Sequence, residues 1–156
     1  MKITSNSVKD TLKIGKIIAK NLHEGDIICL FGQLGSGKTV LTKGIAQGLG
    51  IKKDKIISPT FVLIRQYRAK LPFFHLDLYR LKESKDILAL GYEEYLYNNG
   101  ITVIEWADRL RYLLPEEYLK IELFIKAASQ RLIKFSPIGR HYKGLLRSLK
   151  NIEGDL

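Results

Sequence analysis

The chain has 156 residues, of which 46% are hydrophobic, and it carries a formal net charge of +10 at pH 7. Because this length supports one hydrophobic core, we expect a single domain over residues 1–156, with a frayed tail from about residue 151. We expect neither a membrane span nor a signal peptide, since no apolar run has the required length or flanks, and a cytoplasmic location follows. Cys29 is the only cysteine and lies within an apolar run, so we expect a buried thiol and no internal disulfide.

The first third of the chain predicts a helix, a strand and a second helix. Apolar positions over residues 8–22 recur with the helical period, and Ser7 can cap this helix. Residues 26–31 are one acid followed by a continuous apolar run, which is typical of a strand buried on both faces in a parallel sheet. A glycine-rich turn follows, and residues 38–49 are expected to form a helix that stops at Gly50.

The rest of the chain continues to alternate between strands and helices. In order, we expect two strands that can pair as a hairpin, a mostly helical segment, a buried strand, two further strands and a last helix, over residues 61–67, 73–79, 81–98, 101–106, 119–126, 131–135 and 142–152. Ser84 can cap the helical segment. The pattern predicts an α/β fold of the P-loop NTPase type, with a mostly parallel sheet flanked by helices and some antiparallel strands.

Residues 32–39 match the phosphate-binding pattern G-x-x-x-x-G-K-(S/T), placed between a buried strand and a helix as that loop requires. The three glycines of this segment permit backbone conformations in which successive N–H groups curl around phosphate oxygens. Lys38 is expected to reach the β- and γ-phosphates, and the Thr39 hydroxyl to coordinate Mg²⁺. The alternative is a glycine-rich turn with a surface lysine.

Such a loop also needs an acidic residue at the end of a neighbouring strand to hold the magnesium ion. Glu105 closes an apolar strand and is the first candidate, with a structural ion pair as the alternative. Asp77 is the second, because His75, Asp77 and Tyr79 would share one face of an extended segment. That face is expected to be wet or reactive, unless it is simply a solvated strand edge.

Two further features stay open on residue chemistry alone. Residues 58–60, Ser-Pro-Thr, could bring a hydroxyl to the γ-phosphate as a switch, or could form a simple proline turn. Positive charge without intervening acids gathers near the C-terminus, at Lys126, Arg131, Lys134, Arg140, Lys143, Arg147 and Lys150. This basic C-terminal segment could contact a nucleic acid, or it could be an ordinary solvated lysine-rich surface.

Taken together, the motifs resemble the TsaE family of bacteria, also called YjeE, in order and spacing over about residues 5 to 140. The segments that carry the resemblance are residues 32–39, Ser58-Pro59-Thr60-Phe61, His75-Leu76-Asp77-Leu78-Tyr79-Arg80-Leu81 and Ile104-Glu105-Trp106. The departures are Gln33, where the family often has an acid, Ala107, which replaces a common proline, and the strong positive charge.

The resemblance implies an ATP-binding and ATP-hydrolysing accessory protein that is required for threonylcarbamoyladenosine modification of tRNA. It would work with the TsaD and TsaB proteins, bind ATP or ADP with Mg²⁺, and use Thr39 and Glu105 as magnesium ligands. Asp77 and Lys38 would be catalytic, and residues 58–61 and 75–80 would be two switches. The nucleotide-binding residues implied are Thr11, Gly32, Gly35, Ser36, Gly37, Lys38, Thr39, Val40, Thr60, Trp106 and Arg131.

The sequence leaves several alternatives to this reading. A small-molecule P-loop kinase shares the loop, although residues 81–100 lack the arginine cluster that clamps a transferring phosphoryl group. A nucleotide-gated binding module that contacts tRNA through its basic surface is the other rival. Arg80 and Arg109 are candidates to complete the catalytic site, while Arg131 and Asp108 could instead be plain surface charges.

Overall fold

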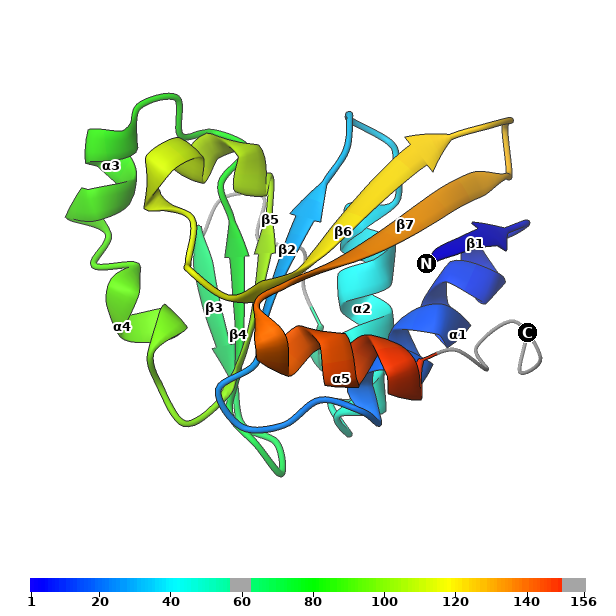
Figure 1. Cartoon of the computed structure of the whole chain (residues 1–156), viewed down its shortest axis with the longest axis horizontal. Helices are drawn as coiled ribbons and strands as arrows, with labels where there is room; N and C mark the ends of the chain where they lie inside the picture. Colours follow the sequence, from blue (N-terminus) through cyan, green and yellow to red (C-terminus); the bar gives the residue numbers. More distant parts are fainter. Residues whose placement is uncertain (57–62, 150–156) are drawn as a thin grey trace.

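The computed structural model describes residues 1–56 and 63–149 and shows one twisted sheet with helices on both sides (Figure 1). The strands are β1 (Lys2–Ser5), β2 (Ile27–Phe31), β3 (Ile64–Tyr67), β4 (Phe73–Asp77), β5 (Ile101–Glu105), β6 (Tyr118–Ile125) and β7 (Arg131–Ile138). Their order across the sheet is β1-β7-β6-β2-β5-β4-β3. The α/β fold class predicted from the sequence is confirmed.

The centre of the sheet is parallel and its two sides are antiparallel. β2 pairs in parallel with both β5 and β6, and β5 pairs in parallel with β4. β3 runs antiparallel to β4, as the predicted hairpin requires, while β1 and β6 both run antiparallel to β7. β2 and β5, in the middle of the sheet, are almost completely buried because helices cover both of their faces.

Two hydrophobic clusters form on opposite faces of the sheet. On one face pack α1 (Val8–Ala19), α2 (Lys38–Gly48) and α5 (Arg140–Ser148), through buried side chains such as Ile14, Leu41 and Leu145. On the other face lie α3 (Ser84–Ala89), α4 (Glu93–Leu96) and the 3₁₀ segment η2 (Ala107–Leu113). Cys29 is fully buried in this second cluster, as expected. A short 3₁₀ turn, η1 (Lys53–Lys55), follows α2.

The start of α1 follows the prediction, since the Asp10 N–H donates a 3.1 Å hydrogen bond to Oγ of Ser7. Other expectations were wrong in detail. The predicted helix over residues 81–98 is two short helices separated at Gly91, whose φ is +63°, and Ser84 is the first helical residue rather than the cap. Neither β1 nor η2 was expected, because four residues in β1 and an irregular turn in η2 give no clear periodicity.

The last predicted helix begins earlier than expected, at Arg140, and its predicted end and the predicted frayed tail lie outside the described residues. None of the helices in residues 1–56 and 63–149 has the length and apolar character needed to cross a membrane. The single-domain expectation over the whole chain stays a prediction.

Candidate functional site

The candidate site lies where the parallel strands β2, β4 and β5 end. The glycine-rich loop follows β2 and leads into α2 at Lys38, while Asp77 and Glu105 are the last residues of β4 and β5. Asp77 pairs with Glu105 in the parallel register, and Glu105 pairs with Leu30 of β2. Because parallel strands present their carboxyl ends at one edge of the sheet, three separate segments meet there, as in other open α/β sheets that bind ligands.

The loop itself fits tightly between its neighbours. A Cβ atom on Gly32 would lie 2.6 Å from the Leu123 backbone oxygen, and the φ of Gly32 is +147°, so a larger residue is excluded both by space and by conformation. Gly37 caps the N-terminus of α2 with a φ of +101°. Within the described residues, the fully buried hydroxyl of Ser36 has no hydrogen-bond partner. The loop therefore holds a buried polar group that a phosphate oxygen could satisfy.

Lys38 lies inside the loop, and only 4% of it is exposed. Its ammonium donates hydrogen bonds to the backbone oxygens of Gly32 at 2.6 Å and Gln33 at 3.0 Å. The same ammonium lies 3.7 Å from the centroid of the Trp106 ring. Burial lowers the pKa of Lys38 from its ordinary value, and the nearby negative charges of the site, with Glu105 first among them, oppose that shift.

Trp106, whose ring makes this contact, has an unusual backbone conformation. Its φ of 58° and ψ of 43° place it in the left-handed region, which costs a residue with a Cβ about 1–2 kcal/mol. Its ring packs against Tyr79 with a centroid separation of 4.8 Å. Strain of this kind often accompanies a functional site.

Glu105 is almost completely buried and joins three segments of the chain. Its Oε2 accepts a 2.7 Å hydrogen bond from the Thr39 hydroxyl, and its Oε1 accepts one of 2.8 Å from Nε2 of His75. Burial alone raises the pKa of the Glu105 carboxyl, but the hydrogen bonds from His75 and Thr39 and the charge of His75 outweigh it, so the pKa lies below its ordinary value. The carboxylate is therefore ionised at neutral pH.

Asp77 has a different electrostatic environment from Glu105. Burial raises the pKa of the Asp77 carboxyl, and the neighbouring Glu105 charge adds to this effect, although the Tyr79 N–H donates to Oδ1 at 3.0 Å and opposes it. Two carboxyl groups at adjacent strand ends are thus shifted in opposite directions, a pattern found where acid and base roles are divided.

Of the face of β4 that was predicted to be wet or reactive, the first member, His75, does not face solvent. His75 is only 1% exposed, because it turns toward Glu105 under the site rather than toward solvent. Its Nδ1 has no hydrogen-bond partner in residues 1–56 and 63–149. Tyr79, in contrast, is 47% exposed. The alternation of side chains along β4 predicted that His75 and Asp77 share one face of the strand. It could not show that Glu105 of the neighbouring strand β5 would lie against His75 on that face.

A small cleft of about 200 Å³ opens beside the loop. Its walls include residues from α1, the loop, α2 and the β6–β7 turn, namely Ser7, Val8, Thr11, Gly35, Gly37, Val40, Ala128, Ser129 and Arg131. The structure thus brings five of the residues implied by the family resemblance into one cleft, and it adds four that the resemblance does not imply. No spacing signal links those four, because Ser7 and Val8 come from the start of α1 and Ala128 and Ser129 from the distant β6–β7 turn.

Arg131 connects the wall of this cleft to the glycine-rich loop by a hydrogen bond. One guanidinium nitrogen donates to the Gly35 backbone oxygen at 3.1 Å, and the other donates to backbone oxygens of the β6–β7 turn. Asp108 is exposed, with one carboxylate oxygen 3.9 Å from Nε of Arg109. The predicted first switch, residues 58–61, and with it the nucleotide-binding prediction for Thr60, lies outside the described residues.

The chain matches one known family, described as "Threonylcarbamoyl adenosine biosynthesis protein TsaE", over residues 5–133. A relative from Treponema pallidum named tRNA threonylcarbamoyladenosine biosynthesis protein TsaE is 40% identical over 133 residues, which are 85% of this chain and 98% of the relative. A relative of the same name from Bacillus subtilis is 39% identical over 143 residues, covering 90% of this chain and 88% of the relative.

A solved structure shows the same architecture. The crystal structure of Bacillus subtilis YdiB is 34% identical in sequence, superposes with a TM-score of 0.84, and covers 97% of this chain and 94% of its own. The similarity therefore extends over nearly the whole fold. The resemblance recognised in the sequence is confirmed, and this chain belongs to the TsaE family of tRNA threonylcarbamoyladenosine biosynthesis proteins.

Proposed function

We propose that this chain binds ATP and ADP with Mg²⁺ and hydrolyses ATP as an accessory protein of threonylcarbamoyladenosine formation in tRNA, together with TsaD and TsaB in the cytoplasm. The observation that carries the proposal is the contact of Thr39 with Glu105 next to the buried ammonium of Lys38. A hydroxyl at the start of a helix, a carboxylate at the end of the adjacent strand and a lysine in the glycine loop are the groups that hold a magnesium–nucleotide complex.

The residues present fit the phosphates and the metal ion. Backbone N–H groups of the loop, with the unpaired Ser36 hydroxyl, would cradle the phosphate oxygens. Lys38 would exchange the backbone oxygens of Gly32 and Gln33 for the β- and γ-phosphates. Thr39 and Glu105 supply oxygen ligands of the kind that Mg²⁺ prefers, and Mg²⁺ usually takes its other ligands from phosphates and water.

The cleft beside Gly35 suits the nucleoside part of the ligand. It adjoins the loop at Gly35 and Gly37, and Val40 and Thr11 form its walls from two different helices. The Thr11 hydroxyl is already bonded to Ser5 at 2.7 Å and to the Ser7 backbone oxygen at 3.3 Å, so Thr11 would mainly shape the wall rather than donate to the ligand. Shape and apolar contact would then position the base.

Hydrolysis by the isolated chain is expected to be slow. Asp77 would accept the proton of the attacking water, helped by a pKa above its ordinary value. An arginine that neutralises charge on the transferred phosphoryl group can contribute about 10³–10⁵ in rate. The guanidinium of Arg131 is held by backbone oxygens and Arg109 lies beside Asp108, so we expect a partner protein to complete the site.

The proposal is tested by measuring ATP hydrolysis by the purified chain alone and with TsaD and TsaB. We expect a low rate alone and a clear stimulation by the partners. Reconstitution of threonylcarbamoyladenosine formation should depend on the wild-type chain and should fail with Lys38→Ala or Glu105→Gln. Equal product formation with and without the chain would refute the pathway role, and transfer of phosphate to an added metabolite would favour a small-molecule kinase instead.

A further inference from the structure

The antiparallel side of the sheet has one face that the helices leave uncovered. In β1, β6 and β7, alternate side chains point to opposite faces of the sheet. Those on the covered face, such as Ile3, Ile121 and Ile133, are buried in the hydrophobic cluster with α1 and α2. In Figure 1, α2 passes behind β6 and β7, and α1 lies beside α2 next to β1. The opposite side chains are exposed or half-buried, and we name this set the open face: Lys2, Thr4, Phe31, Lys120, Glu122, Phe124, Leu132, Lys134 and Ser136.

The strand register brings the open face into one continuous surface. Lys2 of β1 pairs with Lys134 of β7, which pairs with Glu122 of β6, which in turn pairs with Phe31 of β2. Residues paired across a sheet point to the same side, so a row of side chains runs across four strands. Phe124 lies in the next row of the same face.

The charge of the open face is positive. The open face carries three lysines, Lys2, Lys120 and Lys134, and one carboxylate, that of Glu122. The Glu122 carboxylate accepts from the Lys120 ammonium at 3.3 Å and from the Lys134 ammonium at 3.0 Å. The carboxylate is thus already neutralised, which leaves a net attraction for anions. The formal charge of +10 for the whole chain acts in the same direction.

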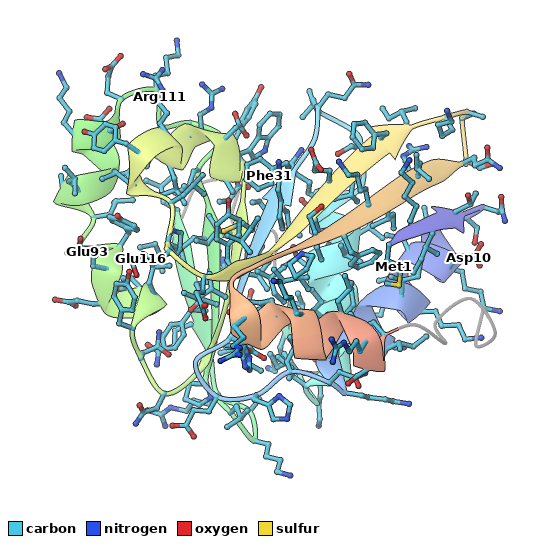
Figure 2. All side chains as sticks on the ribbon, in the orientation of Figure 1. Met1, Asp10, Phe31, Glu93, Arg111 and Glu116 are labelled. Carbon is cyan, nitrogen blue, oxygen red and sulfur yellow. The ribbon has the colours of Figure 1, made fainter. Side chains whose placement is uncertain are left out.

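The open face also carries a pocket with two aromatic walls. A cavity of about 380 Å³ lies between Phe31 and Phe124, with Gly32, Gln33, Glu122, Leu123 and Ile125 around it. Phe124 is 44% exposed, and Ile125 beside it is 39% exposed. The Lys120 ammonium lies 4.9 Å from the centroid of the Phe31 ring. Figure 2 labels Phe31 near the carboxyl end of β2, and the strand register pairs Phe31 with Glu122 of β6.

We propose that the open face binds a single-stranded segment of RNA, with one base in the pocket between Phe31 and Phe124 and phosphates along Lys2 and Lys134. Aromatic side chains on a sheet surface stack on unpaired bases, and neighbouring lysines neutralise the backbone. An acidic protein surface would match the lysines but would not need two aromatic walls around a pocket. The inference rests on the proposed function only for the choice of RNA over DNA.

This surface differs from the basic C-terminal segment that the sequence marked. The structure divides that segment, since Lys134 lies on the open face, Arg131 turns to the glycine loop, and three other basic residues lie on α5. Arg140, Lys143 and Arg147 are exposed at helical spacing on α5, where the neighbouring Tyr142 is buried. The α5 surface could attract phosphates, but its exposed ring, His141, is held by the Asp26 carboxylate, with Nε2 2.6 Å from Oδ1.

The pocket shares its wall with the nucleotide site. Gly32 and Gln33 line it, and the backbone oxygens of these two residues bind the Lys38 ammonium. A nucleotide that draws Lys38 away from these oxygens changes the wall of the pocket. RNA affinity is therefore expected to differ between the nucleotide-free and the nucleotide-bound chain.

The test uses fluorescence anisotropy with a labelled single-stranded RNA of about ten nucleotides, a length in the usual range for such surfaces. Phe124→Ala should weaken binding about five- to a hundredfold, since one stacked base is lost. Tyr112→Ala is the matched control, because Tyr112 is 77% exposed but lies in η2. Lys2→Ala should lower the slope of log affinity against log salt by about 0.7, the value for one phosphate of a single strand.

Three results would overturn the inference. They are an absence of RNA binding at low salt, equal affinity of the wild-type chain and Phe124→Ala, and a loss of binding that follows Lys143→Ala or Arg147→Ala but not the open-face variants. If Phe124→Ala instead abolished association with TsaD or TsaB and left RNA binding intact, the open face would be a protein interface.

Calorimetry with ADP and Mg²⁺, run in parallel, separates this inference from the proposed function. Phe124→Ala should keep the wild-type affinity for ADP and the wild-type thermal stability. A chain that binds ADP but no RNA would refute only the RNA surface, whereas a chain that binds RNA but no nucleotide would refute only the proposed function.

Discussion

The hydroxyl of Thr39 donates a 2.7 Å hydrogen bond to Oε2 of Glu105 across a sequence separation of 66 residues. This bond joins the first turn of α2 to the end of β5, and Glu105 is held from its other side by His75 of β4. The Thr39 hydroxyl oxygen and the Glu105 carboxylate oxygen Oε2 are both suitable magnesium ligands. A bound ion would therefore take the place of the hydrogen bond between them. The side chains are thus positioned by the fold before any ligand binds.

Glu105→Gln should weaken the binding of Mg²⁺ to the nucleotide complex by at least about tenfold, because a neutral amide replaces an ionised ligand. The amide has nearly the same shape, so ADP binding without metal should change little. Titration of Mg²⁺ into the ADP-bound chain by calorimetry measures both effects. Glu24→Gln, a change of an exposed residue near the opposite end of β2, serves as the control. Unchanged magnesium affinity would remove Glu105 from the metal site.

Lys38→Ala should weaken ADP and ATP binding about tenfold or more, since charge-assisted hydrogen bonds to the phosphates are lost. Lys43→Ala, in the same helix but not in the loop, should bind nucleotide as the wild type does. Isothermal titration calorimetry in millimolar Mg²⁺ compares the three proteins. Equal affinities would show that the ammonium of Lys38 stays with the backbone oxygens of the loop when nucleotide binds.

Gly32→Ala should destabilise the fold by about 1–3 kcal/mol, because the added Cβ would lie 2.6 Å from the Leu123 backbone oxygen. Gly144→Ala is the matched control. Gly144 lies within α5, and a Cβ there would meet no atom within 4 Å. That substitution should stabilise the chain by up to about 1 kcal/mol through helix propensity. Urea denaturation of the two variants should therefore give shifts of opposite sign.

Asp77→Asn should stabilise the fold at neutral pH and impair catalysis at the same time. The folded-state pKa of Asp77 lies above its ordinary value of 3.8, so the folded chain binds this proton more tightly than the unfolded chain does. Ionisation of Asp77 therefore costs stability above the folded-state pKa, and the cost disappears as the pH falls below 3.8. The stabilising effect of asparagine should follow the same course.

Thermal denaturation of the wild type and of Asp77→Asn between pH 3 and pH 8 measures this difference. We expect partner-stimulated ATP hydrolysis to fall at least about a hundredfold in the variant, the usual contribution of a positioned general base. A variant that is less stable than the wild type at pH 7 would contradict the electrostatic argument, and one with full activity would contradict the catalytic role.

The local elements and the glycine loop could be predicted from the sequence because their signals are local. Apolar periodicity marked α1, the glycine-rich turn and Gly50 marked the two ends of α2, and continuous apolar runs marked β2 and β5. Short or irregular elements such as β1 and η2 carry no such signal, and the split between α3 and α4 depends on one glycine in the left-handed region.

The sequence by itself determined the position of the glycine-rich loop, the two candidate acids Glu105 and Asp77 and the family to which the chain belongs. Only the tertiary structure decided that β2 lies between β5 and β6, because sheet order depends on the packing of helices over both faces rather than on any local pattern. That order brings His75 under Glu105, places Arg131 against the loop and leaves the open face uncovered. Contacts between distant segments are set by which surfaces can be buried together, and a linear pattern of residues does not contain that information.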